Sequence, residues 1–211
     1  MRRIHKLNQP TVLTDNFETW SAEYQADPTN RTKKYRYRHP EIKETLKEET
    51  KNKCVYCESK IGHNTPGDVE HKLPSSCRRE LHFSWENLTI ACTECNRRKL
   101  AYYDVEKPFL DPYTGGIEER ILHLGPIVSW SPGDAESEIS LRTLQLNDMS
   151  RSDLILRKTE AIDALNNLVA RIQTASDPLL SVLKLKLKEM RSSKFEYSGM
   201  IDAICESYGI D

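Results

Sequence analysis

Four cysteines near the middle of the chain form two Cys-x-x-Cys pairs, Cys54/Cys57 and Cys92/Cys95. A pair with this spacing places two thiolates in one tight turn, and two such pairs supply the tetrahedral ligand set of a structural zinc ion. Basic residues follow Met1 without an apolar run behind them, so we expect no secretion signal and reduced thiols. The alternative is a redox pair, although no βαβ pattern flanks either motif. Cys77 and Cys205 stand alone, and we expect neither to be a ligand.

Polar side chains suited to phosphodiester chemistry lie between and just after these pairs: Glu70, His71, Asn87 and Asn96. Hydrolysis near neutral pH needs a base, and a neutral imidazole is the side chain whose ordinary pKa suits that role. It also needs a hard cation beside the phosphate, and such ions prefer carboxylate and amide oxygens. The pattern therefore favours a small site that combines an imidazole, an acid and an amide.

The ordered motifs Cys54-x-x-Cys57, Asp68-Val-Glu-His71-x-x-Pro74, Trp85-Glu-Asn-Leu88 and Ala91-Cys-x-x-Cys-Asn-x-x-Lys99 resemble an HNH endonuclease of the ββα-metal fold. The resemblance implies that His71 is the general base, that Glu70 and Asn96 hold a catalytic Mg²⁺ or Mn²⁺, and that Asn87 braces the loop that orients the base. The family often has histidine at the last position. An asparagine oxygen there favours Mg²⁺ over zinc. Asp68 shares a strand face with Glu70, and we expect it to support the metal ligands.

The wider chain is similar to the nuclease of Septu-type bacterial anti-phage systems, which are sometimes found with retrons. The cues are the chain length, the helical lead-in, the segment Phe109-Leu-Asp-Pro112 and the helical tail. This resemblance implies a cytoplasmic effector nuclease that works with an ATPase of the ABC/SMC-like type. The C-terminal region would be its docking surface, and no membrane is involved.

Charge is nearly balanced, with 31 Lys+Arg against 32 Asp+Glu, so any grip on nucleic acid must come from local patches. The segment 31–38 holds five basic and two aromatic residues and suits phosphate contact and base stacking, although such runs are as often merely solvated. His63 and His82 are expected in loops rather than at a metal. The candidate nucleic-acid-binding residues are Lys34, Arg36, Arg38, Lys72, Arg97, Arg98 and Lys99.

The resemblance implies an α+β fold, namely a ββα-metal core held together by the four-cysteine zinc site and flanked by mainly helical extensions. We expect a helical and basic lead-in over residues 1–53, the nuclease core over 54–112, and a hairpin with a helical docking region over 113–211. The core should comprise a strand over 68–74, a second short strand within 84–91 and a helix from Cys92 to about Tyr103.

Outside the core, helices are predicted from Asp15, from Pro40 with Ile42 and Leu46 stacked on one face, and from the capping sequence at 150–153. Two further helices should end near Arg191 and Ser207. Residues 123–130 and 137–146 are predicted to form a β-hairpin around Ser131-Pro-Gly-Asp. No stretch approaches the ~18 apolar residues of a membrane span.

Other functions stay open from the residues alone. A non-catalytic zinc module that binds nucleic acid or a partner would carry the same cysteines, and so would a redox protein. If RNA is the substrate, its 2′-hydroxyl can replace water as the nucleophile.

Overall fold

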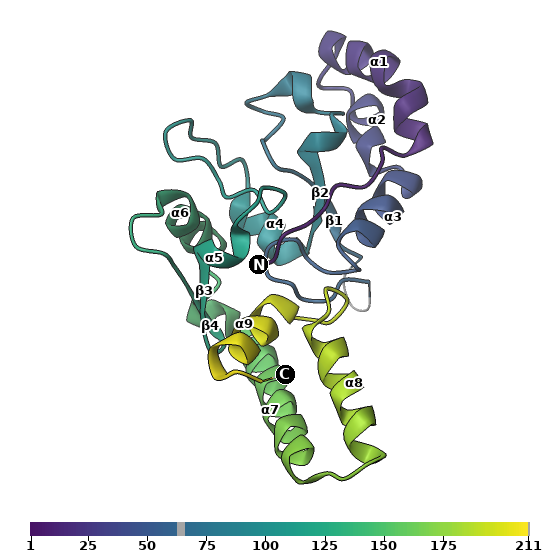
Figure 1. The fold of residues 1–211 in the computed structure, drawn as a ribbon. Coiled ribbons are helices and arrows are strands. Elements are labelled where there is room, and N and C mark those ends of the chain that lie inside the picture. The colour runs from purple at the N-terminus through teal and green to yellow at the C-terminus, as the bar shows by residue number, and fades with distance from the viewer. Residues whose placement is uncertain (63–65, 211) are drawn as a thin grey trace.

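A computed structural model describes residues 1–62 and 66–210 and confirms a mixed α+β fold (Figure 1). The helices are α1 (Thr11–Ala26), α2 (Arg31–Lys34), α3 (Pro40–Glu49), α4 (Thr93–Lys99), α5 (Ile117–Arg120), α6 (Ala135–Leu144), α7 (Ser152–Thr174), α8 (Leu179–Arg191) and α9 (Ser198–Tyr208). The strands are β1 (Asp68–His71), β2 (Leu88–Ala91), β3 (Ile121–Leu124) and β4 (Ile127–Trp130). Short 3-10 turns are η1 (Tyr35–Arg38), η2 (Arg79–Leu81), η3 (Trp85–Asn87) and η4 (Met149–Arg151).

The two predicted core strands form an antiparallel pair in which Asp68 lies opposite Ala91 and His71 lies opposite Leu88. All four residues of β2 are buried, because α3 packs against β2 while α4 contacts β1. Helix α4 begins directly after β2, and the Cys92 side chain caps it by accepting the Cys95 N–H. A ββα unit with its helix against the pair therefore positions the motif residues, as expected.

A glycine turn leads into β1 at the predicted Pro66-Gly67 position. Gly67 has φ +70°, and a Cβ there would lie 2.8 Å from the side chain of Ile61 and 3.2 Å from that of Ile90. The close approach leaves no room for a larger residue, so Gly67 lets the chain turn tightly against the buried strand.

The N-terminal helices cover the other side of the core, and two predicted helix boundaries, one in α1 and one in the core helix α4, need comment. Helix α3 starts at Pro40 with Ile42 and Leu46 fully buried, as expected. Helix α1 starts at Thr11 rather than at Asp15, because Pro10 precedes its first turn and the Leu13 and Thr14 amides bond to the Pro10 carbonyl. Helix α4 ends at Lys99 rather than near Tyr103, since Leu100 turns the chain with φ +48°.

The predicted hairpin over residues 123–146 is wrong in its second half. Strand β3 pairs with β4 instead, across a two-residue turn in which Gly125 has φ +62°. The segment that follows is α6, because the Asp134 side chain caps it by accepting the Ser137 N–H. Its buried residues recur at helical spacing, which is the signal that outweighs strand pairing: Ser137, Ser140, Leu141 and Leu144.

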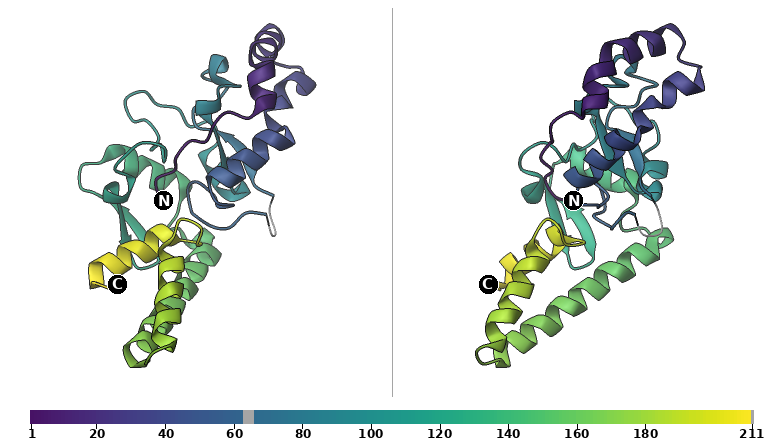
Figure 2. Two further views of the ribbon diagram at one scale, coloured as in Figure 1. Left: turned by 45° about the vertical axis from the view of Figure 1, so that its right-hand side comes forward. Right: turned by 90° about the vertical axis from the view of Figure 1, so that its right-hand side faces the viewer.

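Helices α7 and α8 pack side by side and extend away from the rest of the chain, while α9 returns toward β3 (Figures 1 and 2). The predicted capping box at 150–153 is not formed: Asp148 caps the preceding turn η4 instead, and no side chain caps α7. Helix α9 ends at Gly209 in the left-handed conformation. Of the helices in the described part of the chain, none combines the length and apolar character needed to cross a bilayer.

Candidate functional site

Four sulfur atoms converge between β2, α4 and the turn at residues 54–57. The Sγ atoms of Cys54, Cys57, Cys92 and Cys95 all lie within 4.8 Å of one another, and the Cys57–Cys92 distance is 3.8 Å. A tetrahedron with zinc–sulfur bonds of about 2.3 Å has sulfur–sulfur edges of about 3.8 Å. Both the donor set and its size therefore fit a zinc ion with no open coordination position. Cys77 and Cys205 are outside this group.

His71 ends β1 and lies among aromatic rings. Its ring is parallel to that of His82, with 4.8 Å between centroids, and the edge of Tyr37 approaches at 4.6 Å. His71 Nε2 lies 2.9 Å from the main-chain oxygen of His82. A carbonyl oxygen only accepts hydrogen bonds, so Nε2 carries the hydrogen and donates it. The lone pair of the neutral ring is thus on Nδ1.

The surroundings of His71 keep it neutral. Burial lowers its pKa to about 3, and the His82 ring adds to this effect. The positive charges of Lys99 and Arg38 also disfavour the imidazolium. An unprotonated imidazole with a directed Nδ1 can accept a proton from water.

His82 belongs to the same cluster, a role that the sequence did not reveal. It is almost fully buried and stacks between His71 and Tyr24, whose centroid lies 3.9 Å from its own. His82 Nε2 lies 2.8 Å from the Lys34 carbonyl, and Nδ1 lies 2.8 Å from Ser75 Oγ. His82 is therefore held on both nitrogens. His63, the other loop histidine of the sequence analysis, is outside the described residues.

Asn87 uses its whole amide to hold the loop between β1 and η3. Its Oδ1 accepts the Leu73 N–H at 2.8 Å, and its Nδ2 donates to the carbonyls of Leu73 and Leu81 at 2.9 and 3.2 Å. The loop so fixed leads directly into His82, whose carbonyl orients His71. This geometry suits a brace rather than a group that touches the substrate.

Glu70 meets α4 through an ion pair that corrects one expectation. Its Oε1 lies 2.6 Å from Lys99 Nζ, which also donates to the His71 carbonyl at 2.9 Å. Lys99 is 1% exposed, so the predicted phosphate contact by Lys99 is wrong. The residue lies on the inner face of α4, four positions after the buried Cys95. Burial raises the pKa of Glu70, and the Lys99 charge opposes that shift.

Asn96 and Asp68 form a second contact between α4 and β1. Asn96 Nδ2 donates to Asp68 Oδ2 at 3.3 Å, which leaves the Asn96 carbonyl oxygen for another partner. The negative charge of Asp68 also acts on Glu70. Two carboxylates and one amide oxygen thus gather on one side of β1, and such a donor set suits a hard cation such as Mg²⁺. Lys99 already holds one oxygen of Glu70.

The acid group and the imidazole leave β1 on opposite faces, because successive strand residues alternate. Among the described residues no hydrogen bond joins the His71 ring to Glu70 or Asn96. The two sides still act on each other: Lys99 touches the carbonyl of His71 and the carboxylate of Glu70, and the Glu70 charge reaches Tyr37. The structure therefore brings Asp68, Glu70 and Asn96 together, with His71 at the adjacent strand end.

The remaining basic candidates fall into two groups, those that form an ion pair with an acidic side chain and those that do not. Arg36 pairs with Glu23, Lys72 with Asp111 at 2.7 Å, and Arg97 and Arg98 share Glu94. In the described part of the chain, Lys34 and Arg38 have no carboxylate within ion-pair distance. Arg38 is exposed and lies over the Tyr35 ring at 4.4 Å. Tyr37 is buried against the histidines, so it is not free to stack on bases.

Comparison with known proteins agrees with the motif. Residues 54–101 match the family model described as HNH endonuclease. The Septu protein PtuB of Bacillus thuringiensis is 29% identical, over 53% of this chain and 43% of that protein. The Septu protein PtuB of Bacillus mycoides strain KBAB4 is 26% identical, over 67% of this chain and 62% of that protein. The chain spans less than two thirds of either relative, and the resemblance to an HNH nuclease of the Septu type is confirmed.

Proposed function

We propose that this chain is an HNH endonuclease that hydrolyses phosphodiester bonds in nucleic acid, with DNA favoured as substrate. The observation that carries the proposal is the hydrogen bond from His71 Nε2 to the His82 carbonyl. It fixes the tautomer, so that the lone pair of the buried, neutral ring is on Nδ1 at the end of β1.

In the proposed reaction His71 Nδ1 removes a proton from water. The resulting hydroxide attacks phosphorus in line with the 3′ oxygen, the bond between phosphorus and that oxygen breaks, and the leaving oxygen takes a proton from solvent water. Asn87 acts through the loop that presents the His82 carbonyl, so it is a positioning residue. A divalent cation, Mg²⁺ or Mn²⁺, held by Glu70 and Asn96 with support from Asp68 would lie on the other face of β1 from the His71 ring. The two would therefore act on one phosphate only past the end of β1, where the cation would neutralise charge on the phosphate and on the leaving oxygen.

Substrate would approach along α2 and η1, beside the histidine pair. His82 Nε2 bonds to the carbonyl of Lys34, so this basic segment lies directly against the site. Lys34 and Arg38, which no described carboxylate neutralises, are the proposed phosphate contacts. We retain Arg36, Lys72, Arg97 and Arg98 as secondary candidates, because each must leave an acid partner to reach a phosphate.

The setting we propose is a bacterial anti-phage defence complex in which the chain is the effector nuclease, because two Septu proteins match it. The partner that the resemblance implies is an ABC/SMC-like ATPase, and we assign its docking surface to the C-terminal helices. Helix α8 supports this assignment, because Leu179, Val182 and Leu185 are 48, 60 and 67% exposed on it. Apolar side chains so exposed mark an interaction surface.

The test uses the purified full chain, alone and co-expressed with its neighbours, with labelled DNA and RNA and added Mg²⁺. We expect His71→Ala to abolish cleavage while its zinc content and circular dichroism stay those of the parent chain. His5→Ala, at an exposed histidine outside the cluster, is the matched control and should cleave normally. Cleavage retained by His71→Ala would overturn the proposal.

The second candidate is a zinc-stabilised module that binds nucleic acid or a partner without catalysis. The Lys99–Glu70 pair favours it, because that ammonium already occupies one oxygen of a proposed metal ligand. This candidate predicts that His71→Ala still binds the nucleic acid or the partner. It also predicts that no preparation of the chain cleaves nucleic acid. A redox function predicts that the cysteines are reversibly oxidised and that the protein holds no stoichiometric zinc. Measuring the zinc content of the purified protein tests this alternative.

A further inference from the structure

Two buried cations from the C-terminal region lie beside the four-cysteine cluster. Arg151, in η4, is 7% exposed, and its Nη1 donates to Cys95 Sγ at 3.4 Å and to the Leu144 carbonyl at 3.1 Å. Lys158, in α7, is 3% exposed; its Nζ donates to the Pro126 carbonyl at 3.3 Å, and its side chain lines the same small cavity as Cys57. Across residues 1–62 and 66–210, neither has a carboxylate within ion-pair distance.

Lys158 occupies a position where an apolar residue is expected. The buried face of α7 carries Leu154, Leu165 and Leu168, and Lys158 lies between them at helical spacing. Arg151 lies in η4, immediately before α7, and its guanidinium is directed at Cys95. A buried charge without a counter-charge costs several kcal/mol. The two cations therefore require a negative partner that the carboxylates do not supply.

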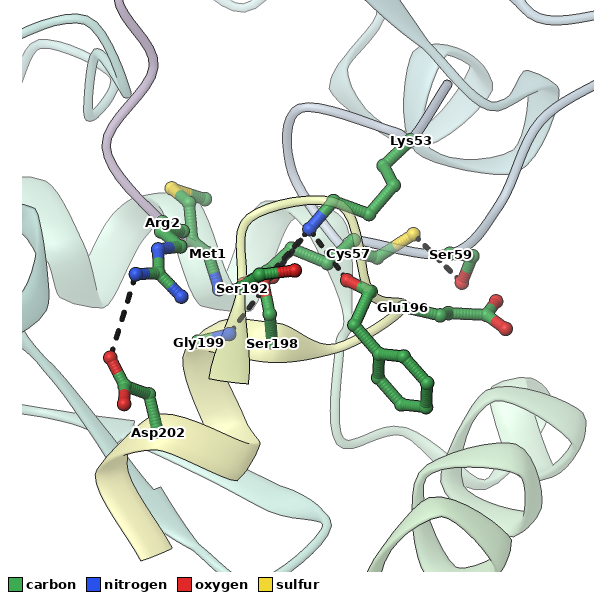
Figure 3. Close-up of polar contacts among 12 residues, drawn as sticks. Met1, Arg2, Lys53, Cys57, Ser59, Ser192, Glu196, Ser198, Gly199 and Asp202 are labelled. Carbon is green, nitrogen blue, oxygen red and sulfur yellow. Dashed lines mark hydrogen bonds and ion pairs between the residues drawn. The ribbon is translucent and has the colours of Figure 1, made fainter. Parts of the chain in front are cut away.

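The one buried acid nearby is already engaged. Glu58 follows the first cysteine pair and is 4% exposed. Its carboxylate binds Lys53 Nζ at 3.3 Å, the Met1 α-amine at 3.0 Å and the Gly199 N–H at 3.0 Å. In Figure 3 Lys53 points toward Ser198 and Gly199, at the start of α9. The Glu58 charge acts on Lys158 through space, but its oxygens are bound by Lys53, the α-amine and the Gly199 N–H rather than by Arg151 or Lys158.

We propose that Arg151 and Lys158 are the counter-cations of a zinc tetrathiolate, and that zinc thereby holds the C-terminal helices on the nuclease core. Four thiolates around Zn²⁺ carry a net charge of about −2, which two cations balance. Without the metal, the same cations would face four neutral thiols or an unbalanced set of charges. The inference rests on the zinc site and not on nuclease activity.

A second connection reaches the sulfurs from the loop between α8 and α9. Ser59 Oγ lies 3.3 Å from Cys57 Sγ and 3.1 Å from the Tyr197 hydroxyl, and Figure 3 shows Ser59 beside Cys57. The Lys60 N–H donates to Glu196 Oε1 at 2.8 Å. The helical region thus reaches the cysteine cluster at two places: directly at η4, where Arg151 contacts Cys95, and indirectly at the α8–α9 loop, where Tyr197 contacts Ser59, which contacts Cys57. Zinc occupancy therefore controls the surface that we assign to partner docking.

The test measures zinc release from the full chain with a chromogenic chelator. Arg151→Gln removes the charge and should release zinc ~10-fold faster or more, as loss of an outer partner of a metal ligand does. Arg151→Lys restores the charge and should recover part of the retention. Arg157→Gln, at an exposed arginine on α7, is the matched control and should release zinc at the parental rate. Release from Arg151→Gln at the parental rate would overturn the proposal.

Hydrogen exchange distinguishes zinc that holds the C-terminal helices on the core from zinc that stabilises the whole chain. On zinc removal we expect faster exchange over residues 149–208, with much less change in α1. Equal loss of protection in both regions would overturn the proposal, since zinc would then stabilise the whole chain. If Arg151→Gln fails to fold, Lys158→Met keeps the apolar stem and provides the same comparison. Neither readout uses cleavage, so a chain without nuclease activity leaves the result interpretable.

Discussion

The rings of His71 and His82 lie parallel with 4.8 Å between their centroids, and the main-chain oxygen of His82 fixes the tautomer of His71. The second histidine therefore acts on the first in two ways, through its ring and through its backbone. Its own side-chain nitrogens hold it to Ser75 and to the Lys34 carbonyl. The base and the basic segment thus share one rigid support.

Replacing His82 by phenylalanine should test the two side-chain hydrogen bonds that hold its ring in place. His82→Phe keeps a ring between Tyr24 and His71 but leaves the Lys34 carbonyl and the Ser75 hydroxyl without their partner. An unsatisfied buried polar group costs about 1–3 kcal/mol, so we expect a loss of that size in the free energy of unfolding, measured in urea. Phe in place of exposed His5 is the control. Unchanged stability of His82→Phe would show that the two hydrogen bonds do not hold the ring.

The Lys99–Glu70 pair provides a second prediction. Lys99→Met leaves the buried Glu70 carboxylate without a cation, and breaking a buried pair in this way costs about 3–5 kcal/mol. We expect a corresponding drop in the free energy of unfolding. Arg97→Met breaks the solvent-exposed contact with Glu94 on the same helix and should change stability little. If Lys99→Met and Arg97→Met have the same free energy of unfolding, the Glu70 carboxylate is not isolated from water.

The core elements could be predicted because their signals are local. The cysteine spacing, the glycine turn and the alternation around Glu70 and His71 together determine β1, β2 and α4. The hairpin error at residues 137–146 has an equally local cause. Asp134 caps a helix there, and the buried side chains follow a period of 3.6 rather than 2.

The rest of the site depends on contacts between distant segments, which a single sequence does not display. His82 acts on His71 through its main-chain oxygen, which every residue type has, so the sequence does not indicate this role. Lys99 reads as a surface cation because Arg97 and Arg98 precede it, yet the helix turns it inward. Lys158 differs from these residues, because a charge at an apolar position of the α7 pattern is visible in the sequence itself.

Acid should destabilise the fold through His123 on β3. Its Nδ1 is buried and has no hydrogen-bond partner among the described residues, and burial lowers its pKa to about 3. Between about pH 6.5 and pH 3 the unfolded chain binds a proton that the folded chain does not. The free energy of unfolding therefore falls as the pH falls through that range, by up to about 1.4 kcal/mol per pH unit for this group.

Urea unfolding at about pH 7 and about pH 5 checks this expectation. His123→Phe removes the group that titrates and should show a smaller loss of stability between the two conditions than the parent chain. His5→Phe should keep the parental pH dependence. An identical loss in His123→Phe would assign the acid sensitivity to other groups, including His71, whose pKa burial also lowers to about 3.

Salt dependence should distinguish the cations that contact phosphate. Each phosphate contact releases counterions from the nucleic acid, so log K falls with log salt by about 0.9 per contact for duplex DNA. Arg38 is exposed, has no described acid partner and lies beside the His71 cluster, so Arg38→Gln should weaken binding and reduce that slope by about one. Arg97 is held by Glu94, and Arg97→Gln should leave the slope nearly unchanged. The binding is measured with the His71→Ala chain, so that cleavage does not consume the probe. Equal slopes for the Arg38→Gln and parental chains would remove η1 from the path of the substrate, because a cation that touches a phosphate must change the number of released ions.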